Sequence, residues 1–195
     1  MRLRTRLRAG QDAPLFDVFD MYGRPVSLLR CAGSRVLLAF HRAANCPLCS
    51  LRLWRLIQHY PTLQRQGVVV IAFFESAPDY AHLYLDRMRP PFPIIADLER
   101  RVYDLYGLET SLMGALVARL KRGAAYREAS RLHLGGHPWL NPLTMDGHVG
   151  RLPADFLLDP DLRVRVAYYG RDAGDFLVYS EIESLVAPGA VRTWW

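Results

Sequence analysis

Two cysteines separated by two residues, in the stretch Cys46-Pro-Leu-Cys49, are the residues of this chain best suited to chemistry. The thiolate is the reactive form of cysteine, and two neighbouring thiols can cycle between a dithiol and a disulfide. Because a CxxC pair near a βαβ pattern is typical of redox proteins, the spacing favours thiol–disulfide chemistry. The alternative is a pair of ordinary buried cysteines. The third cysteine, Cys31, is interpreted as a small core or loop residue.

The residues on either side of the pair predict the elements that position it. Arg35 to Phe40 is a short apolar, β-prone run, and Pro47 to Tyr60 carries apolar residues at helical spacing until Pro61. Val68 to Phe73 is a second strongly apolar strand. This order predicts a right-handed βαβ crossover with parallel strands, with the cysteine pair at the turn from the first strand into the helix.

A helix N-terminus changes the chemistry of a thiol. Asn45 is a good N-cap residue, and Pro47 suits the first helical turn because it has no N–H to leave unpaired. The positive end of the helix dipole then favours a thiolate at Cys46. Cys49 follows one helical turn later, close enough to form a disulfide with an oxidised Cys46.

Composition excludes several classes of function. The chain has 195 residues, of which 51% are hydrophobic and 23% charged, as is ordinary for a soluble globular protein, and no apolar run approaches a membrane span. The net charge of +6 comes mostly from scattered arginines without a nucleic-acid-binding motif, so we expect no nucleic-acid partner. The spacing of His133 and His137 superficially suits zinc, but Gly135-Gly136 and the distance from the cysteines argue against a metal site.

The remaining sequence predicts one domain in a reducing compartment, the cytoplasm, because the start is not a secretory signal and three cysteines make no disulfide framework. Ala154 to Asp159 and Arg163 to Tyr168 predict a β-hairpin. Beyond Gly123 the helical pattern weakens. Trp194 and Trp195 could pack on a partner subunit, giving a homodimer, or form a free tail. The expected divisions of the single domain 1–195 are a basic arm 1–12, a helical or loop insertion 110–150 and a tail 187–195.

Several motifs in collinear order, from Ala13 to Val186, resemble the peroxiredoxin-like branch of the alkyl hydroperoxide reductase and thiol-specific antioxidant superfamily. The resemblance implies an α/β, thioredoxin-like fold: a central mixed sheet flanked by helices, with the insertion before the C-terminal hairpin. The motifs are Ala13-Pro-Leu-Phe-Asp17, Gly23-Arg-Pro-Val-Ser-Leu28, Phe40-His-Arg-Ala-Ala-Asn-Cys-Pro-Leu-Cys49, Pro91-Phe-Pro-Ile-Ile-Ala-Asp97, Tyr103-Asp-Leu-Tyr-Gly107, Leu152-Pro-Ala-Asp-Phe-Leu-Leu-Asp-Pro-Asp161 and Tyr169-Gly-Arg-Asp-Ala-Gly-Asp175.

The resemblance also implies roles for residues. Cys46 would attack a peroxide or a disulfide, Cys49 would resolve the product, and an external dithiol such as thioredoxin would restore both thiols without a bound cofactor. Leu152-Pro153 could be a cis-proline bond facing the cysteines. Typical peroxiredoxins have a proline and a threonine or serine ahead of the nucleophile, where this chain has Ala39 and Ala43. This departure favours disulfide exchange, the collinear likeness favours peroxide reduction, and a non-catalytic binding module is the third alternative.

Four further side chains are candidates to support the thiolate. Arg42 lies between the strand and Cys46, and Arg151 lies where peroxiredoxins often bring an arginine to the thiolate. An arginine beside the thiolate would lower the pKa of the thiol. The alternative is that each is an ordinary surface arginine. His41 could donate a proton or pack in the core. Glu75 follows the strand Val68 to Phe73 and could shuttle protons at the edge of the sheet where parallel-sheet sites lie.

Overall fold

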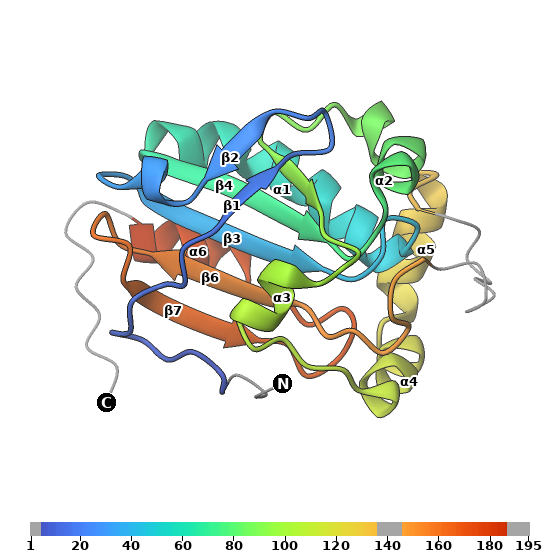
Figure 1. The fold of residues 1–195 in the computed structure, drawn as a ribbon. Helices are drawn as coiled ribbons and strands as arrows, with labels where there is room; N and C mark the ends of the chain where they lie inside the picture. The colour runs from blue at the N-terminus through green and yellow to red at the C-terminus, as the bar shows by residue number, and fades with distance from the viewer. Residues whose placement is uncertain (1–4, 136–145, 187–195) are drawn as a thin grey trace.

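A mixed β-sheet with helices on both faces forms the centre of the molecule in a computed structural model, which describes residues 5–135 and 146–186 (Figure 1). Its strands run in the order β5-β4-β3-β6-β7, and a separate antiparallel pair is formed by β1 and β2. β3, β4 and β5 are mutually parallel, whereas β6 is antiparallel to both β3 and β7. The predicted parallel crossover and C-terminal hairpin are therefore confirmed. The strands are β1 (Asp17–Phe19), β2 (Pro25–Ser27), β3 (Arg35–His41), β4 (Val68–Phe74), β5 (Ile94–Ala96), β6 (Ala154–Leu158) and β7 (Val164–Tyr169).

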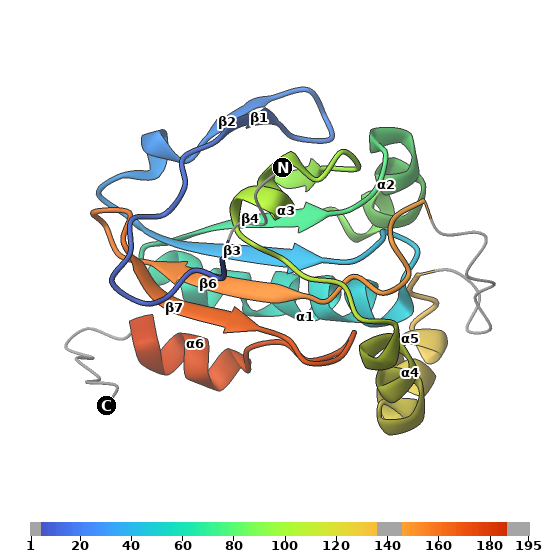
Figure 2. The same cartoon turned by 60° about the horizontal axis from the view of Figure 1, so that its bottom comes forward.

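Two hydrophobic cores fill the space between the sheet and the elements that cover it. Helices α1 and α6 cover one face of the sheet, and α3 and the N-terminal segment cover the other (Figure 2). On β3, Leu37 and Ala39 belong to the core on the α1 and α6 side, while Leu38 and Phe40 belong to the core on the α3 side. A strand buried on both faces needs apolar side chains at every position, which explains its unbroken apolar sequence. The α-helices are α1 (Pro47–Arg65), α2 (Pro78–Leu85), α3 (Arg101–Leu105), α4 (Leu112–Lys121), α5 (Gly123–Arg131) and α6 (Tyr179–Val186), with 3-10 turns at Leu29–Cys31 and Asp86–Met88.

Helix α1 is longer and more deeply covered than its sequence predicts. It continues through Pro61 to Arg65 because the fully buried side chain of Leu63 anchors its last turn in the core. Arg52, which the helical spacing places on a solvent face, is also buried, because it forms an ion pair with Asp155 of β6. The prediction that the helix ends before Pro61 is therefore wrong.

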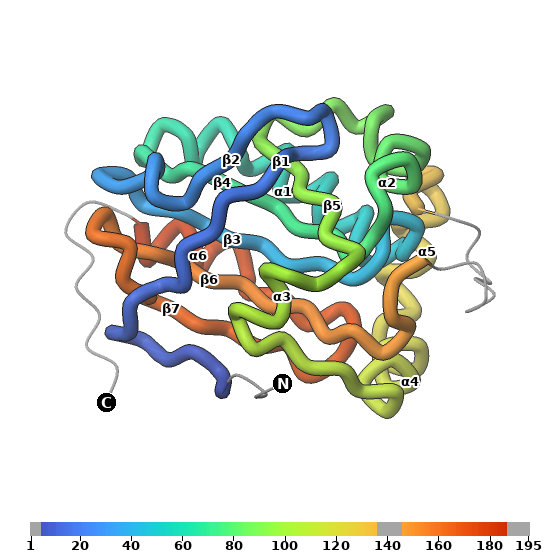
Figure 3. Tube along the Cα trace, in the orientation of Figure 1, coloured from blue at the N-terminus to red at the C-terminus, as the bar shows by residue number. Residues whose placement is uncertain are grey.

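Two helices of the segment 110–150 lie at the end of the sheet toward which β3 and β4 run (Figures 1 and 2). From α5 the chain returns through residues 146–153 to β6, as the tube in Figure 3 shows. The weak sequence pattern beyond Gly123 nevertheless forms α5. The domain boundaries stay a prediction, and Trp194, Trp195 and His137 lie outside the described residues. Within the described ranges, no helix is both long enough and apolar enough to cross a bilayer.

Candidate active site

The cysteine pair lies where β3 passes into α1, as predicted. Cys46 is itself the N-cap residue of α1, and Pro47 occupies the first turn. The prediction that Asn45 caps the helix is wrong: its side-chain amide donates to the Tyr80 hydroxyl at 3.1 Å. Both thiols are free, and both cysteines are completely buried. The junction of strand and helix thus presents two reduced thiols within one helical turn.

Arg42 contacts the first of these thiols directly. Its Nη2 donates to Cys46 Sγ at 3.1 Å, and its Nη1 donates to the carbonyl oxygen of Val149 at 2.6 Å. The side chain is almost fully buried, with 7% of the residue exposed. A guanidinium is always charged and holds its donors in a fixed fork, so this contact places a permanent positive charge beside the sulfur.

The pKa values of the two thiols are shifted in opposite directions. Burial raises the pKa of Cys46, but the hydrogen bond from the Cys49 thiol and the positive charge of Arg42 outweigh it and lower that pKa to about 5. Burial, followed by the adjacent Cys46 sulfur, raises the pKa of Cys49 well above its ordinary value. At neutral pH the pair therefore contains one thiolate, Cys46, and one protonated thiol, Cys49.

Arg151 and Glu75 form a buried ion pair with each other. Arg151 Nε lies 2.5 Å from Glu75 Oε2, and Arg151 Nη1 donates to the carbonyl oxygen of Leu108 at 3.1 Å. The backbone N–H of Glu75 donates to the carbonyl oxygen of Arg42 at 2.9 Å. The backbone of Glu75 thus lies beside that of Arg42, and Arg151 donates to Glu75 and to backbone carbonyl oxygens; among the described residues, its hydrogen bonds do not include the predicted contact with the thiolate.

His41 and Pro153 differ from what the sequence suggested. Burial lowers the pKa of His41 to about 3, and its Nδ1 lies 3.2 Å from the carbonyl oxygen of Phe73 while its ring stacks on Phe74. A neutral imidazole turned toward the core cannot serve as a proton donor to the thiolate, so the alternative of a core histidine holds. None of the described peptide bonds is cis, so the expectation for Leu152-Pro153 is wrong.

The end of α5 and the residues that follow it cover the start of α1. Leu134 packs with Leu51 of α1 and Ala129 of α5. Gly135 has a φ of 72°, and a Cβ added there would lie 2.8 Å from Cα of Pro47. The backbone of this segment therefore contacts the helix start directly, and this contact accounts for part of the burial of the cysteines.

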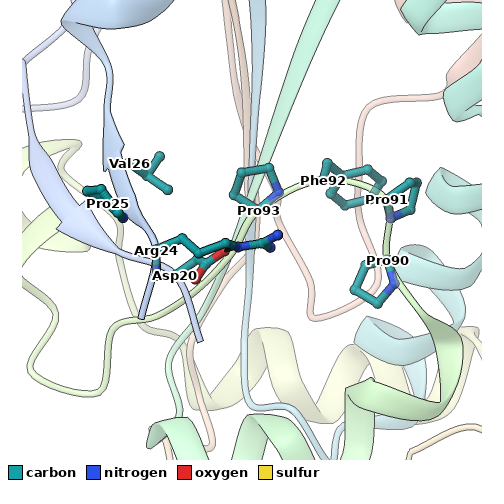
Figure 4. Close-up of a pocket in the computed structure, with 8 residues that line it drawn as sticks. All are labelled: Asp20, Arg24, Pro25, Val26, Pro90, Pro91, Phe92 and Pro93. Atoms are coloured by element: carbon teal, nitrogen blue, oxygen red, sulfur yellow. Dashed lines mark hydrogen bonds and ion pairs between the residues drawn. The ribbon is translucent and has the colours of Figure 1, made fainter. Parts of the chain in front are cut away.

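A recess elsewhere on the surface does not belong to this site. It has a volume of about 420 Å³ and lies between the β1–β2 hairpin and the loop before β5 (Figure 4). Its lining contains no cysteine, and the only charged side chains in it, Asp20 and Arg24, form an ion pair with each other at 2.7 Å. Among the described residues, no group of three or more histidine, cysteine or acidic side chains could hold a metal ion.

Comparison with known proteins decides the family. The family model of the AhpC/TSA family matches residues 9–167. The chain belongs to the AhpC/TSA family. It is therefore a thiol oxidoreductase of the peroxiredoxin-like type, and the predicted resemblance is confirmed.

Some relatives of this AhpC/TSA chain are named peroxiredoxins, and another is named a thiol-disulfide oxidoreductase. It is 29% identical to peroxiredoxin Bcp of Escherichia coli K12 over 110 residues, which are 55% of this chain and 70% of that protein. It is 28% identical to the thiol-disulfide oxidoreductase ResA of Halalkalibacterium halodurans over 134 residues, which are 68% of this chain and 72% of that protein.

Solved structures confirm the thioredoxin-like fold. Peroxidoxin BcpB from Mycobacterium tuberculosis superposes with a TM-score of 0.66 at 15% identity, covering 96% of this chain and 100% of that one. Yeast mitochondrial 1-Cys peroxiredoxin also gives a TM-score of 0.66, at 19% identity, covering 92% of this chain and 75% of that one.

The sequence patterns did not reveal one contributor to the site, Val149, or the buried ion pair between α1 and β6. The carbonyl oxygen of Val149, which orients Arg42, belongs to the backbone, and no side-chain pattern could reveal it. Asp155 accepts hydrogen bonds from Arg52 Nη2 at 3.4 Å and from the backbone N–H of Leu177 at 2.8 Å. A lone aspartate in an otherwise apolar strand was the available signal, because a buried carboxylate needs a partner.

Proposed function

We propose that this protein reduces peroxides through Cys46. The observation that carries the proposal is the contact between the Arg42 guanidinium and the sulfur of Cys46 at 3.1 Å, beside the protonated thiol of Cys49. The Cys46 thiolate attacks the terminal peroxide oxygen, so that an S–O bond forms, the O–O bond breaks, and water or an alcohol leaves. Cys49 then attacks the sulfenic acid, forming a disulfide and releasing a second water.

An external dithiol completes the cycle. The disulfide of Cys46 and Cys49 takes two electrons and two protons from a thioredoxin-type reductant, which becomes a disulfide in turn. The proposal needs no bound cofactor, because all electrons pass through sulfur. It places the protein in the cytoplasm, where dithiol reductants keep cysteines reduced.

The test couples the protein to thioredoxin, thioredoxin reductase and NADPH, with hydrogen peroxide as the oxidant. We expect NADPH oxidation that depends on peroxide, is lost in Cys46→Ser, and is retained in Cys31→Ser as the matched control. Reduction of insulin disulfides without peroxide consumption would instead select disulfide exchange, the activity in the name of the relative ResA. Absence of both activities would leave the binding module.

A further inference from the structure

Helix α5 packs against the N-terminal part of α1, which carries the cysteines. At Gly174 an added Cβ would meet Leu48 Cδ1 at 3.1 Å and Arg122 Cγ at 3.3 Å, so Arg122, the residue before α5, and Leu48, one of the two residues between the cysteines, both lie against Gly174. Within α5, Ala129 packs with Leu51 of α1. The side of α5 on which Arg122 and Ala129 lie therefore faces the first turns of α1.

Tyr126 lies on this face. It follows Arg122 by four residues and precedes Ala129 by three, which puts all three side chains on one side of the helix. Its ring packs against the core that includes Cys46 and Cys49. Among the described residues, the Tyr126 hydroxyl has no hydrogen-bond partner. The hydroxyl oxygen is also not fully buried, so solvent can contact it. Tyr126 therefore puts a polar group on the side of α5 that packs on the core containing both cysteines.

The charges of the site keep this hydroxyl protonated. Burial, and after it the negative charge of the Cys46 thiolate, raises the pKa of Tyr126 to about 12, while Arg42 acts in the opposite direction. The hydroxyl therefore lies within the electrostatic field of the same thiolate and guanidinium that form the candidate active site. At neutral pH it is available as a hydrogen-bond donor.

Peroxide cleavage needs such a donor, because the departing oxygen gains negative charge as the O–O bond breaks. Ala43 and Ala44, which lead to Cys46, have no hydroxyl, and the buried ring of His41 faces the core. Arg42 already donates to the sulfur and to a backbone carbonyl. The groups next to Cys46 in the chain therefore leave the departing oxygen without a hydroxyl donor.

We propose that the Tyr126 hydroxyl donates a hydrogen bond to the departing oxygen of a peroxide bound over Cys46. This inference rests on the proposed function and adds helix α5 to the catalytic machinery. As the Cys46 sulfur bonds to the terminal oxygen, the other oxygen leaves with the electron pair of the O–O bond and takes a proton from Tyr126, which regains one from solvent. The products are the Cys46 sulfenic acid and water or an alcohol.

Two reactions of Cys46, measured side by side, test the inference. Stopped-flow oxidation by hydrogen peroxide requires a donor for the departing oxygen, whereas alkylation by iodoacetamide releases iodide, which requires none. For Tyr126→Phe we expect oxidation to slow about 100-fold, at the low end of the effect of losing such a donor, with alkylation unchanged. Tyr60→Phe, on α1 and packed against Phe92, is the matched control and should change neither rate.

Three outcomes would overturn the inference. If both rates of Tyr126→Phe equal those of the wild type, the hydroxyl takes no part in the reaction. If both rates fall together, Tyr126 acts on the thiolate or on the fold, not on the departing oxygen. If the wild type itself does not react with peroxide while its alkylation is fast, the proposed function fails first, and the inference fails with it.

Discussion

Replacing Arg42 with methionine should make Cys46 a markedly weaker acid. The guanidinium lies 3.1 Å from the sulfur inside the protein, where an opposite charge at such range typically shifts a pKa by about one to three units. The pKa of Cys46, about 5 in the wild type, should therefore rise to roughly 6 to 8 in Arg42→Met. At pH 6 the thiolate fraction would fall from about 90% to between about 50% and 1%.

The assay is the rate of iodoacetamide alkylation of Cys46 between pH 4 and pH 10. Because the folded-state pKa is depressed, reactivity in the wild type should be constant above neutral pH and be lost as the pH falls through about 5. The pH midpoint of alkylation should move upward in Arg42→Met. It should move by less in Arg42→Lys, which keeps the positive charge but loses the paired N–H donors of the guanidinium.

Arg55→Met supplies the control for this assay. Arg55 lies in α1, and its ion pair with Glu128 is at the surface, so its removal should leave the midpoint in place. A midpoint that stays near 5 in Arg42→Met would refute the account of how the thiolate is stabilised.

Three further predictions concern the second thiol and the residues around the site. Cys49→Ser should let peroxide oxidise Cys46 once but not turn over, with a sulfenic acid detectable by dimedone labelling. Glu75→Gln leaves the buried arginine without its counter-ion and should cost about 3–5 kcal/mol in urea unfolding, against less than about 1 kcal/mol for the exposed Glu99→Gln. Gly135→Ala should lower the free energy of unfolding by about 1–2 kcal/mol, because alanine disfavours the positive φ, and should speed the reaction of Cys46 with a bulky aromatic disulfide. Gly33→Ala, also at a positive φ but in open space, should not affect the reaction of the thiol.

Local sequence was sufficient for the elements that carry the cysteines. The apolar run of β3 and the helical spacing after Pro47 are short-range signals, and they placed Cys46 at the start of α1. Arg42 could be proposed because it is four residues from Cys46 along the chain. The cap was misassigned because the chain turns into the helix one residue later than Asn45, so that Cys46 itself takes the cap position.

Long-range contacts account for the rest of the site. Arg151 is 76 residues from Glu75 in the chain, so their ion pair depends on how the segment before β6 lies against the residues that follow β4. Helical periodicity predicts that Arg52 is exposed, because periodicity cannot reveal the carboxylate of Asp155 on a distant strand. Tyr126 lies where the sequence pattern is weakest, and only the packing of α5 on α1 connects it with the cysteines.

Peptide mass spectrometry after brief exposure to stoichiometric hydrogen peroxide shows which cysteine reacts with peroxide. The reduced wild type and Cys49→Ser are treated for seconds, quenched with an alkylating reagent and digested. We expect a disulfide between Cys46 and Cys49 in the wild type and a sulfenic acid confined to Cys46 in the variant, with Cys31 alkylated in both. If both proteins keep every cysteine reduced, or if oxidation falls on Cys31, the assignment of Cys46 as a peroxide-reducing nucleophile is contradicted.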